Sequence, residues 1–171
     1  MEAPDRKAGH MTLSPSEKAG DENRIVAWNR ELAAVHQRLR RALRLAREAI
    51  DAGDAASAGN DLLLYCHGFC AALSGHHVSE DDALFPELAE RHPELRPTIA
   101  KLQQDHELIA SLLRQFEQAL NSGAPPERLS SHLDGLSAIM ESHFQYEERQ
   151  LLGPLAALDL DLAPGTALGP L

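Results

Sequence analysis

The chain has 171 residues, of which 43% are hydrophobic, and this is enough to bury the core of one domain. The formal net charge of −10 argues against nucleic acid as a partner, because contacts to phosphates need clustered Lys and Arg. No apolar run approaches the ~18 residues that cross a bilayer, and the polar start of the chain lacks the apolar segment of a secretion signal. These features predict a cytoplasmic protein that does not enter a membrane.

Helical periodicity divides the chain into successive segments. Residues 1–20 are rich in Pro, Gly, Ser and charge without periodicity, so we expect a disordered tail. Apolar residues then recur at helical spacing over about 21–52. A second helical pattern covers about 57–85, and the proline that follows is expected to bend the helix before residue 90. A third helix is expected over about 97–120, with a proline in its first turn, and a fourth over about 127–152.

The succession of helices predicts the fold class. No segment shows the alternation typical of a strand. Four long helices joined by short connections predict an all-α protein, an antiparallel up-down-up-down four-helix bundle. Residues 156–171 contain two prolines and two glycines, so we expect an irregular arm. The predicted organisation is therefore a tail at 1–20, a bundle at 21–155 and an arm at 156–171.

One pattern occurs twice, as His76-x-x-x-Glu80 and His143-x-x-x-Glu147. Residues four apart on a helix stand on one face about one turn apart, so each copy directs an imidazole and a carboxylate toward one point. Each copy also has a single histidine about one helix earlier in the chain. The candidate metal ligands are therefore His36, His76, Glu80, His106, His143 and Glu147.

These six residues lie on the apolar stripes of their helices, where an unpaired imidazole or carboxylate is costly to bury. Metal coordination removes that cost, because a neutral imidazole binds through one nitrogen and a carboxylate can bridge two cations. A mixed nitrogen and oxygen set suits iron or manganese, and zinc less well. The internal repeat predicts two helical hairpins related by a pseudo-twofold axis around two metal ions. The alternative, a set of satisfied core polar groups, does not explain six ordered matches.

The ordered pattern resembles the hemerythrin-like, or HHE cation-binding, domains. The Glu-Asp/Glu-x-x-Leu sequences that follow each motif and the Asp-His-Glu-Leu context of His106 strengthen the match, which covers about residues 22–155. The resemblance implies a non-haem di-iron centre in a four-helix bundle, with Glu80 and Glu147 as bridging carboxylates. Manganese, a mixed iron and manganese pair, or zinc remain alternatives for the same ligands.

The chain departs from the oxygen-carrying members in two ways. They carry His-x-x-x-His on the third helix, but Leu102 and Ala110 flank His106 at that spacing. They also end in His-x-x-x-x-Asp, whereas this chain has His-x-x-x-Glu. One iron therefore loses a histidine or gains another ligand. The nearest spare ligand is His77, offset by about 100° from His76 on the helix, and an exposed or outer position is its alternative.

The remaining polar and thiol groups receive structural interpretations. Tyr65 and His132 take equivalent places on the inward stripes, so we expect them to be core or pocket-lining residues. The acidic run that contains Asp81 supplies one ligand, and we expect its other members to be solvated. Cys66 and Cys70 are expected to be small buried residues in a reducing compartment rather than a thiol switch. The alternating leucines between residues 158 and 162 suit either a partner or the protein's own surface.

Three functions follow from the predicted centre. An open coordination position favours reaction with O₂, H₂O₂ or NO over reversible carriage, as in a sensor, a scavenger or a peroxidase-like enzyme. The second hypothesis is a non-catalytic iron-responsive or iron-holding module whose fold depends on metal. The third is a di-metal oxidase or oxygenase that acts on an organic substrate. Enzyme and non-enzyme readings both stay open at this point, as does the oligomeric state.

Overall fold

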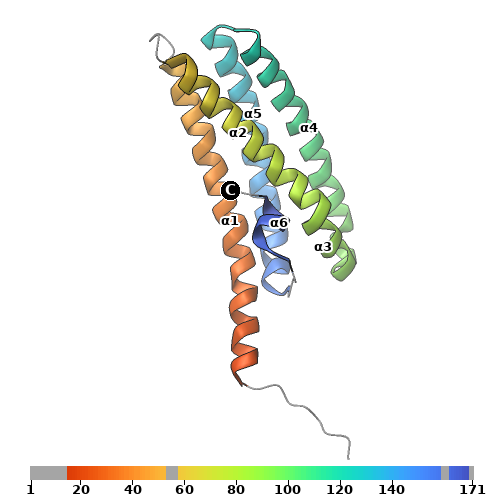
Figure 1. Cartoon of the computed structure of the whole chain (residues 1–171). Coiled ribbons are helices and arrows are strands. Elements are labelled where there is room, and N and C mark those ends of the chain that lie inside the picture. Colours follow the sequence, from red (N-terminus) through yellow and green to blue (C-terminus); the bar gives the residue numbers. More distant parts are fainter. Residues whose placement is uncertain (1–14, 53–57, 159–161, 170–171) are drawn as a thin grey trace, which may run out of the picture.

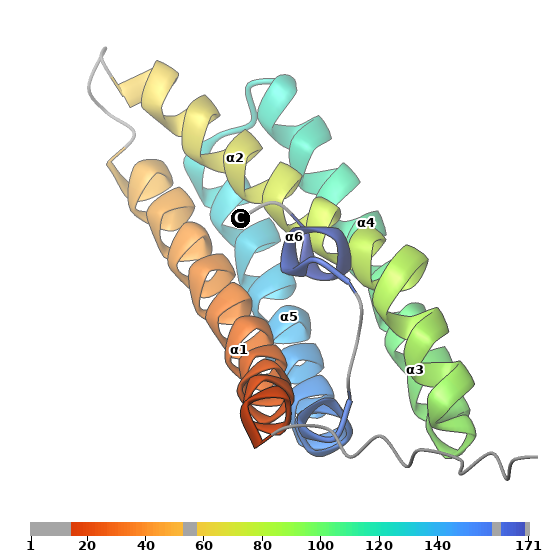
Figure 2. The same cartoon turned by 60° about the horizontal axis from the view of Figure 1, so that its bottom comes forward.

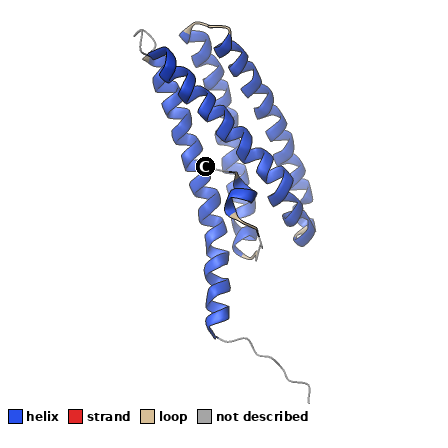
Figure 3. Cartoon of the chain, in the orientation of Figure 1, coloured by secondary structure: helices blue, strands red, loops and turns tan. Residues whose placement is uncertain are grey.

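The computed structural model describes the backbone of residues 15–52, 58–158 and 162–169, and every regular element in these ranges is helical (Figure 3). The prediction of an all-α protein is therefore confirmed. The long helices are α1 (Pro15–Asp51), α2 (Ala58–Ser79), α4 (Arg96–Asn121) and α5 (Pro126–Ala156). The shorter elements are the π-helical turn η1 (Glu80–Leu84), α3 (Phe85–Arg91), the 3₁₀ turn η2 (Pro93–Leu95) and α6 (Pro164–Leu168).

The long helices lie side by side, and the chain reverses direction from each to the next (Figures 1 and 2). Helix α1 packs against α5 and α2, and α4 packs against the same two helices. The sequence prediction of four helices was too simple, because the second segment continues through η1 into α3 and because α6 follows α5. None of the helices in the described part of the chain has the length and hydropathy of a membrane span.

The π-helical turn interrupts the second long segment just before the proline at which the sequence predicted a bend. The Phe85 amide donates to the Glu80 carbonyl, five residues back, which is the hydrogen bond of a π-helix. Pro86 follows and has no N–H to continue an α-helical ladder. The wider turn accommodates the proline, and the helix continues to Arg91. Such turns are frequent at functional sites, and this one begins at a candidate ligand.

Both ends of the chain differ from expectation where the structure describes them. Helix α1 begins at Pro15, inside the segment expected to be a tail, whereas residues 1–14 lie outside the described residues. The expected irregular arm contains α6, whose Ala167 and Leu168 are 0% and 1% exposed. These apolar residues bury against α1, α2 and η1, which explains why the segment is ordered rather than irregular. Leu158 is also buried, so this part of the leucine pattern docks on the protein's own surface.

Two residues that were predicted to face inward, Tyr65 and His132, are not buried in the structure. Tyr65 is 42% exposed and His132 is half-buried, so neither belongs to the buried core. On α2 the buried positions near Tyr65 are Cys66 and Phe69, of which Phe69 lies on the predicted stripe. Residues 65 and 76 are eleven apart and share a face to within about 20°, so the exposure of Tyr65 means that this face is not covered so far from the ligands. The buried cysteines confirm the structural interpretation of these thiols.

Truncation of a core leucine tests how tightly the helices pack. Leu133 on α5 is 0% exposed, so Leu133→Ala should lower the free energy of unfolding by about 2–5 kcal/mol through the cavity that it leaves. Leu64→Ala is the control, because Leu64 is 67% exposed and should change stability by less than about 0.5 kcal/mol. Urea denaturation measures both. Equal effects of the two substitutions would contradict the packing described here.

Candidate metal centre

All six candidate ligands, together with His77, converge in the interior between the long helices. Helix α1 contributes one histidine, α2 contributes two, α4 contributes one, η1 contributes a glutamate, and α5 contributes a histidine and a glutamate. None of the seven side chains is more than 5% exposed. The seven residues are His36, His76, His77, Glu80, His106, His143 and Glu147.

The seven side chains form two groups whose metal-binding atoms lie within 4.8 Å of one another in each group. A metal held at about 2.0–2.2 Å by each donor brings its donors within ~4.4 Å of one another, so each group needs little contraction to hold an ion. The first group contains three histidines and the second contains two histidines and both glutamates. The groups are His77, His106 and His143, and His36, His76, Glu80 and Glu147.

Both carboxylates lie between the two groups. Glu80 places Oε1 at 3.3 Å from Nε2 of His76 and Oε2 at 3.6 Å from Nε2 of His106. Glu147 places Oε2 at 3.3 Å from Nε2 of His36 and at 3.5 Å from Nε2 of the neighbouring histidine of α5. Each carboxylate therefore contacts a histidine of both groups. This is the arrangement that a bridging carboxylate requires.

The outer nitrogens of two histidines are held by carboxylates. Nδ1 of His36 lies 2.8 Å from Oε1 of Glu148, and Nδ1 of His106 lies 3.0 Å from Oδ1 of Asp81. Such partners orient a metal-binding imidazole and select the tautomer whose Nε2 is free to bind. The expectation that Asp81 is merely solvated is therefore wrong. Its position directly after Glu80, like that of Glu148 after the second motif, was the available signal in the sequence.

The other two histidines of the motifs have different outer partners. Nδ1 of His143 faces Asp105, with 3.7 Å between it and Oδ2. Nδ1 of His76 instead lies 3.0 Å from the backbone carbonyl oxygen of Leu168, which comes from the C-terminal segment. A backbone carbonyl 92 residues away carries no signal in the sequence. Sequence reasoning therefore missed this contact entirely.

Aromatic rings close the centre against water. The ring of Phe144 stacks on His36 with centroids 3.9 Å apart, and Phe85 stacks on His106 at 5.5 Å. His77 stacks on His106 at 4.0 Å, which fixes its ring against the first group. These contacts limit ring rotation and lower the local dielectric, so charges inside the centre interact strongly.

Many of the inward-facing atoms have no hydrogen-bond partner among the described residues. A buried polar atom without a partner costs about 1–3 kcal/mol, and a charged one costs more. Within one domain interior, such a concentration needs a further group that binds to these atoms. A metal cation fits, because imidazole nitrogens and carboxylate oxygens are its ligands. The inward-facing atoms without a partner are Nε2 of His36, His76 and His77 and both carboxylate oxygens of Glu80 and Glu147, and the outer Nδ1 of His143 also has none.

Burial keeps most of the imidazoles neutral and therefore able to bind metal. It lowers the pKa of His76 to about 3 and that of His143 to about 4, and it lowers the pKa of His77 well below the usual value. His36 behaves differently. Burial alone would lower its pKa, but Glu147 and Glu148 outweigh this effect and raise the pKa of His36 above 6.5.

The carboxyl groups of Glu80 and Glu147 have pKa values shifted in opposite directions. Burial, and then the charge of Glu147, raise the pKa of Glu80 well above its usual value. Burial alone would also raise the pKa of Glu147, but His36 and the other nearby histidines lower it. Without a cation the centre therefore holds one neutral carboxyl group, and one carboxylate beside a protonated imidazole. A divalent cation held by these side chains would take the place of those protons.

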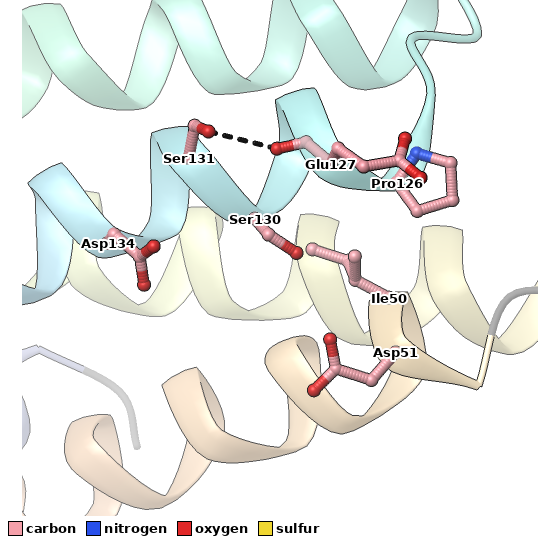
Figure 4. Close-up of a pocket in the computed structure, with 7 residues that line it drawn as sticks. All are labelled: Ile50, Asp51, Pro126, Glu127, Ser130, Ser131 and Asp134. Atoms are coloured by element: carbon pink, nitrogen blue, oxygen red, sulfur yellow. Dashed lines mark hydrogen bonds between the residues drawn. The ribbon is translucent and has the colours of Figure 1, made fainter.

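A small pocket reaches the first group from the surface between α2 and α4. It has a volume of about 280 Å³, and its lining residues are Ser74, His77, Val78, Asp81, His106, Glu107, Ala110 and Leu113. Most of the lining surface is apolar, although two carboxylates stand in it, so it suits a small neutral molecule more than an anion. A larger pocket of about 630 Å³ lies near the end of α1 and the start of α5, where Figure 4 shows Asp51, Glu127, Ser130 and Asp134. It includes none of the converging ligands.

The two cysteines take no part in the centre. Cys66 and Cys70 are free and buried on α2. Burial raises the pKa of Cys66 to about 11 and is the main cause that raises that of Cys70 to about 12. Both thiols are therefore protonated and poorly reactive near neutral pH.

A model of a known protein family matches most of this chain. The hemerythrin HHE cation-binding domain matches residues 29–155, which include all seven converging side chains. The chain belongs to this family. No curated protein and no solved structure matches the chain significantly. This HHE domain is therefore a cation-binding module, and its converging His and Glu groups are compatible with that role.

Metal binding to this HHE domain should release protons. Because His36 has a pKa raised above 6.5, it carries a proton below that pH and loses it as the pH rises through the raised value. The apparent affinity for a divalent metal should therefore increase as the pH is raised from 6.5. Calorimetric titration in two buffers with different ionisation enthalpies measures the released protons. A heat that is independent of the buffer would contradict this protonation state.

Proposed function

We propose that this chain is a non-haem di-iron protein that binds or reacts with O₂, H₂O₂ or NO. One iron would be held by His77, His106 and His143, and the other by His36 and His76, with Glu80 and Glu147 bridging them. The observation that carries the proposal is the position of the two glutamates, whose carboxylate oxygens contact histidines of both groups at 3.3–3.6 Å. In this proposal the long helices act as a four-helix bundle domain at about residues 21–155, in a cytoplasmic protein.

His77 supplies the ligand that the third helix lacks. The flanking positions of His106 carry Leu102 and Ala110, so α4 offers one histidine only. His77 stacks on His106 at 4.0 Å and has an unpartnered Nε2 in the same group. Adjacent residues on a helix are about 100° apart, so His76 and His77 face different groups from one turn of α2. This supports five histidines and two carboxylates as the complete ligand set.

The unequal groups favour reactivity with a small molecule. Three histidines and two bridges fill more positions on one ion than two histidines and two bridges fill on the other. Bound iron would supply a redox change and an open coordination position at the less filled side. The chain itself packs Phe144 and Phe85 against the centre, which limits the access of bulk water. Small molecules would reach the centre through the pocket beside His77 and His106, which lies on the side of the first group.

Two other functions rest on particular observations. The unpartnered polar atoms favour an iron-holding module whose stability depends on the metal, with or without a reaction. Equal melting temperatures of metal-free and metal-loaded protein would count against that second candidate. An oxidase or oxygenase of an organic substrate is less favoured, because the pocket of about 280 Å³ is smaller than the ~300–1,000 Å³ of most ligand sites.

Removal of His77 tests the proposed ligand set. His77→Gln should weaken the binding of one of two Fe(II) ions by at least about 10-fold, since even the loss of a partner behind a ligand costs 10–100-fold. His67→Gln is the matched control, because His67 lies on the same helix, its side chain is 43% exposed, and its Nδ1 approaches Glu117 at 3.9 Å outside the centre. Anaerobic Fe(II) titration with elemental analysis measures the stoichiometry. Two ions bound with unchanged affinity in His77→Gln would exclude His77 as a ligand.

Exposure of the reduced, iron-loaded protein to O₂ or NO tests the proposed reactivity. We expect new charge-transfer absorption in the near-ultraviolet and visible range, because ligands at an open iron position change its electronic spectrum. Mössbauer spectra of the same sample identify whether both irons change. A spectroscopically silent sample that holds two irons would refute the reaction and leave the iron-holding module as the better account.

A further inference from the structure

Helix α6 (Pro164–Leu168) of the C-terminal segment packs against α2 (Figure 2). Helix α6 packs against η1, α2 and α1, and Leu168 is 1% exposed. Gly169 adopts a φ of 85°, a left-handed conformation that favours glycine. A Cβ at this position would lie 3.0 Å from the Gly75 carbonyl oxygen and 3.1 Å from Cα of His76. The segment therefore lies so close to the turn that carries His76 that a side chain at residue 169 would collide with its backbone.

This close approach brings one backbone atom to a ligand. The carbonyl oxygen of Leu168 lies 3.0 Å from Nδ1 of His76, and the contact is buried. A carbonyl oxygen can only accept a hydrogen bond, so Nδ1 of a neutral His76 must carry the hydrogen. The lone pair then remains on Nε2, which faces Oε1 of Glu80 at 3.3 Å. Rotation of the imidazole would leave the buried carbonyl and the imidazole N–H without partners.

The contact differs in kind from those of the other motif histidines. His36, His106 and His143 face the carboxylates of Glu148, Asp81 and Asp105 with their Nδ1 atoms. These carboxylates come from α5, η1 and α4, which also carry ligands. Only His76 among these four histidines depends on a segment that carries no ligand of its own.

We propose that the segment Pro164–Gly169 is a positioning element of the metal centre, which fixes the Nδ1–H tautomer of His76 through the Leu168 carbonyl. This inference rests on the proposed two-metal function. Gly169 allows the approach, and the buried Ala167 and Leu168 anchor it to the core. Displacement of the segment would release His76 from its orientation and weaken the ion held by the second group, while the first group keeps its three histidines.

A pair of glycine substitutions in the full chain separates positioning from general stability. Gly169→Ala introduces a Cβ that meets backbone atoms and strains the positive φ, so it should displace the Leu168 carbonyl. Gly165→Ala is the matched control, because a Cβ there meets nothing within 4 Å. Co(II) titration followed by visible absorption should show one of two ions bound about 10–100-fold more weakly in Gly169→Ala, with no change in Gly165→Ala.

A second measurement uses the unmodified, metal-free chain and does not depend on how the glycine variants fold. The imidazole ¹⁵N signals of His76 are assigned as those that disappear in His76→Gln. Their chemical shifts should be those of the Nδ1–H tautomer. An Nε2–H tautomer would overturn the inference, as would equal Co(II) affinities of the two glycine variants. Failure of the unmodified chain to bind two Co(II) ions would instead overturn the proposed function, so the two failures are distinguishable.

Discussion

Two carboxylates buried in one interior are the constraint on which the rest of the structure depends. Glu80 and Glu147 are each 0% exposed, and none of their oxygens has a hydrogen-bond partner among the described residues. Burial of an unpaired carboxylate costs several kcal/mol, which is comparable to the whole stability of a domain. The interior therefore requires positive charge between the helices. Protons on His36 and Glu80 supply part of it without metal, and two divalent cations would neutralise the carboxylates fully.

The surrounding structure orients the metal-binding side chains toward the space between the helices. The π-helical turn η1 lets the helix pass Pro86 while it keeps Glu80 inside. Arg40 donates to Glu148 at 3.3 Å and to Glu141 at 2.7 Å, and Glu148 in turn holds His36. This network anchors the orientation of one imidazole to α1 and α5 together. Stability and metal geometry therefore depend on the same contacts.

The sequence predicted the helices and six of the seven converging residues, because a spacing of four on a helix fixes a shared face whatever the detailed packing. It left His77 open, since a position 100° away from a stripe turns inward only where two sites lie side by side. Tyr65 was misplaced because helical spacing fixes the face on which a side chain lies but not how far the neighbouring helices cover that face. The Leu168 carbonyl could not be predicted, because a backbone atom has no residue type and its position depends on how α6 folds back.

Anomalous diffraction at the iron edge from iron-loaded crystals tests the central claim most directly. Two peaks should appear, one among His77, His106 and His143 and the other beside His36 and His76, with the carboxylates of Glu80 and Glu147 between them. This result would assign all seven ligands in one measurement. A single peak, or peaks away from these side chains, would contradict a two-metal centre built from this set.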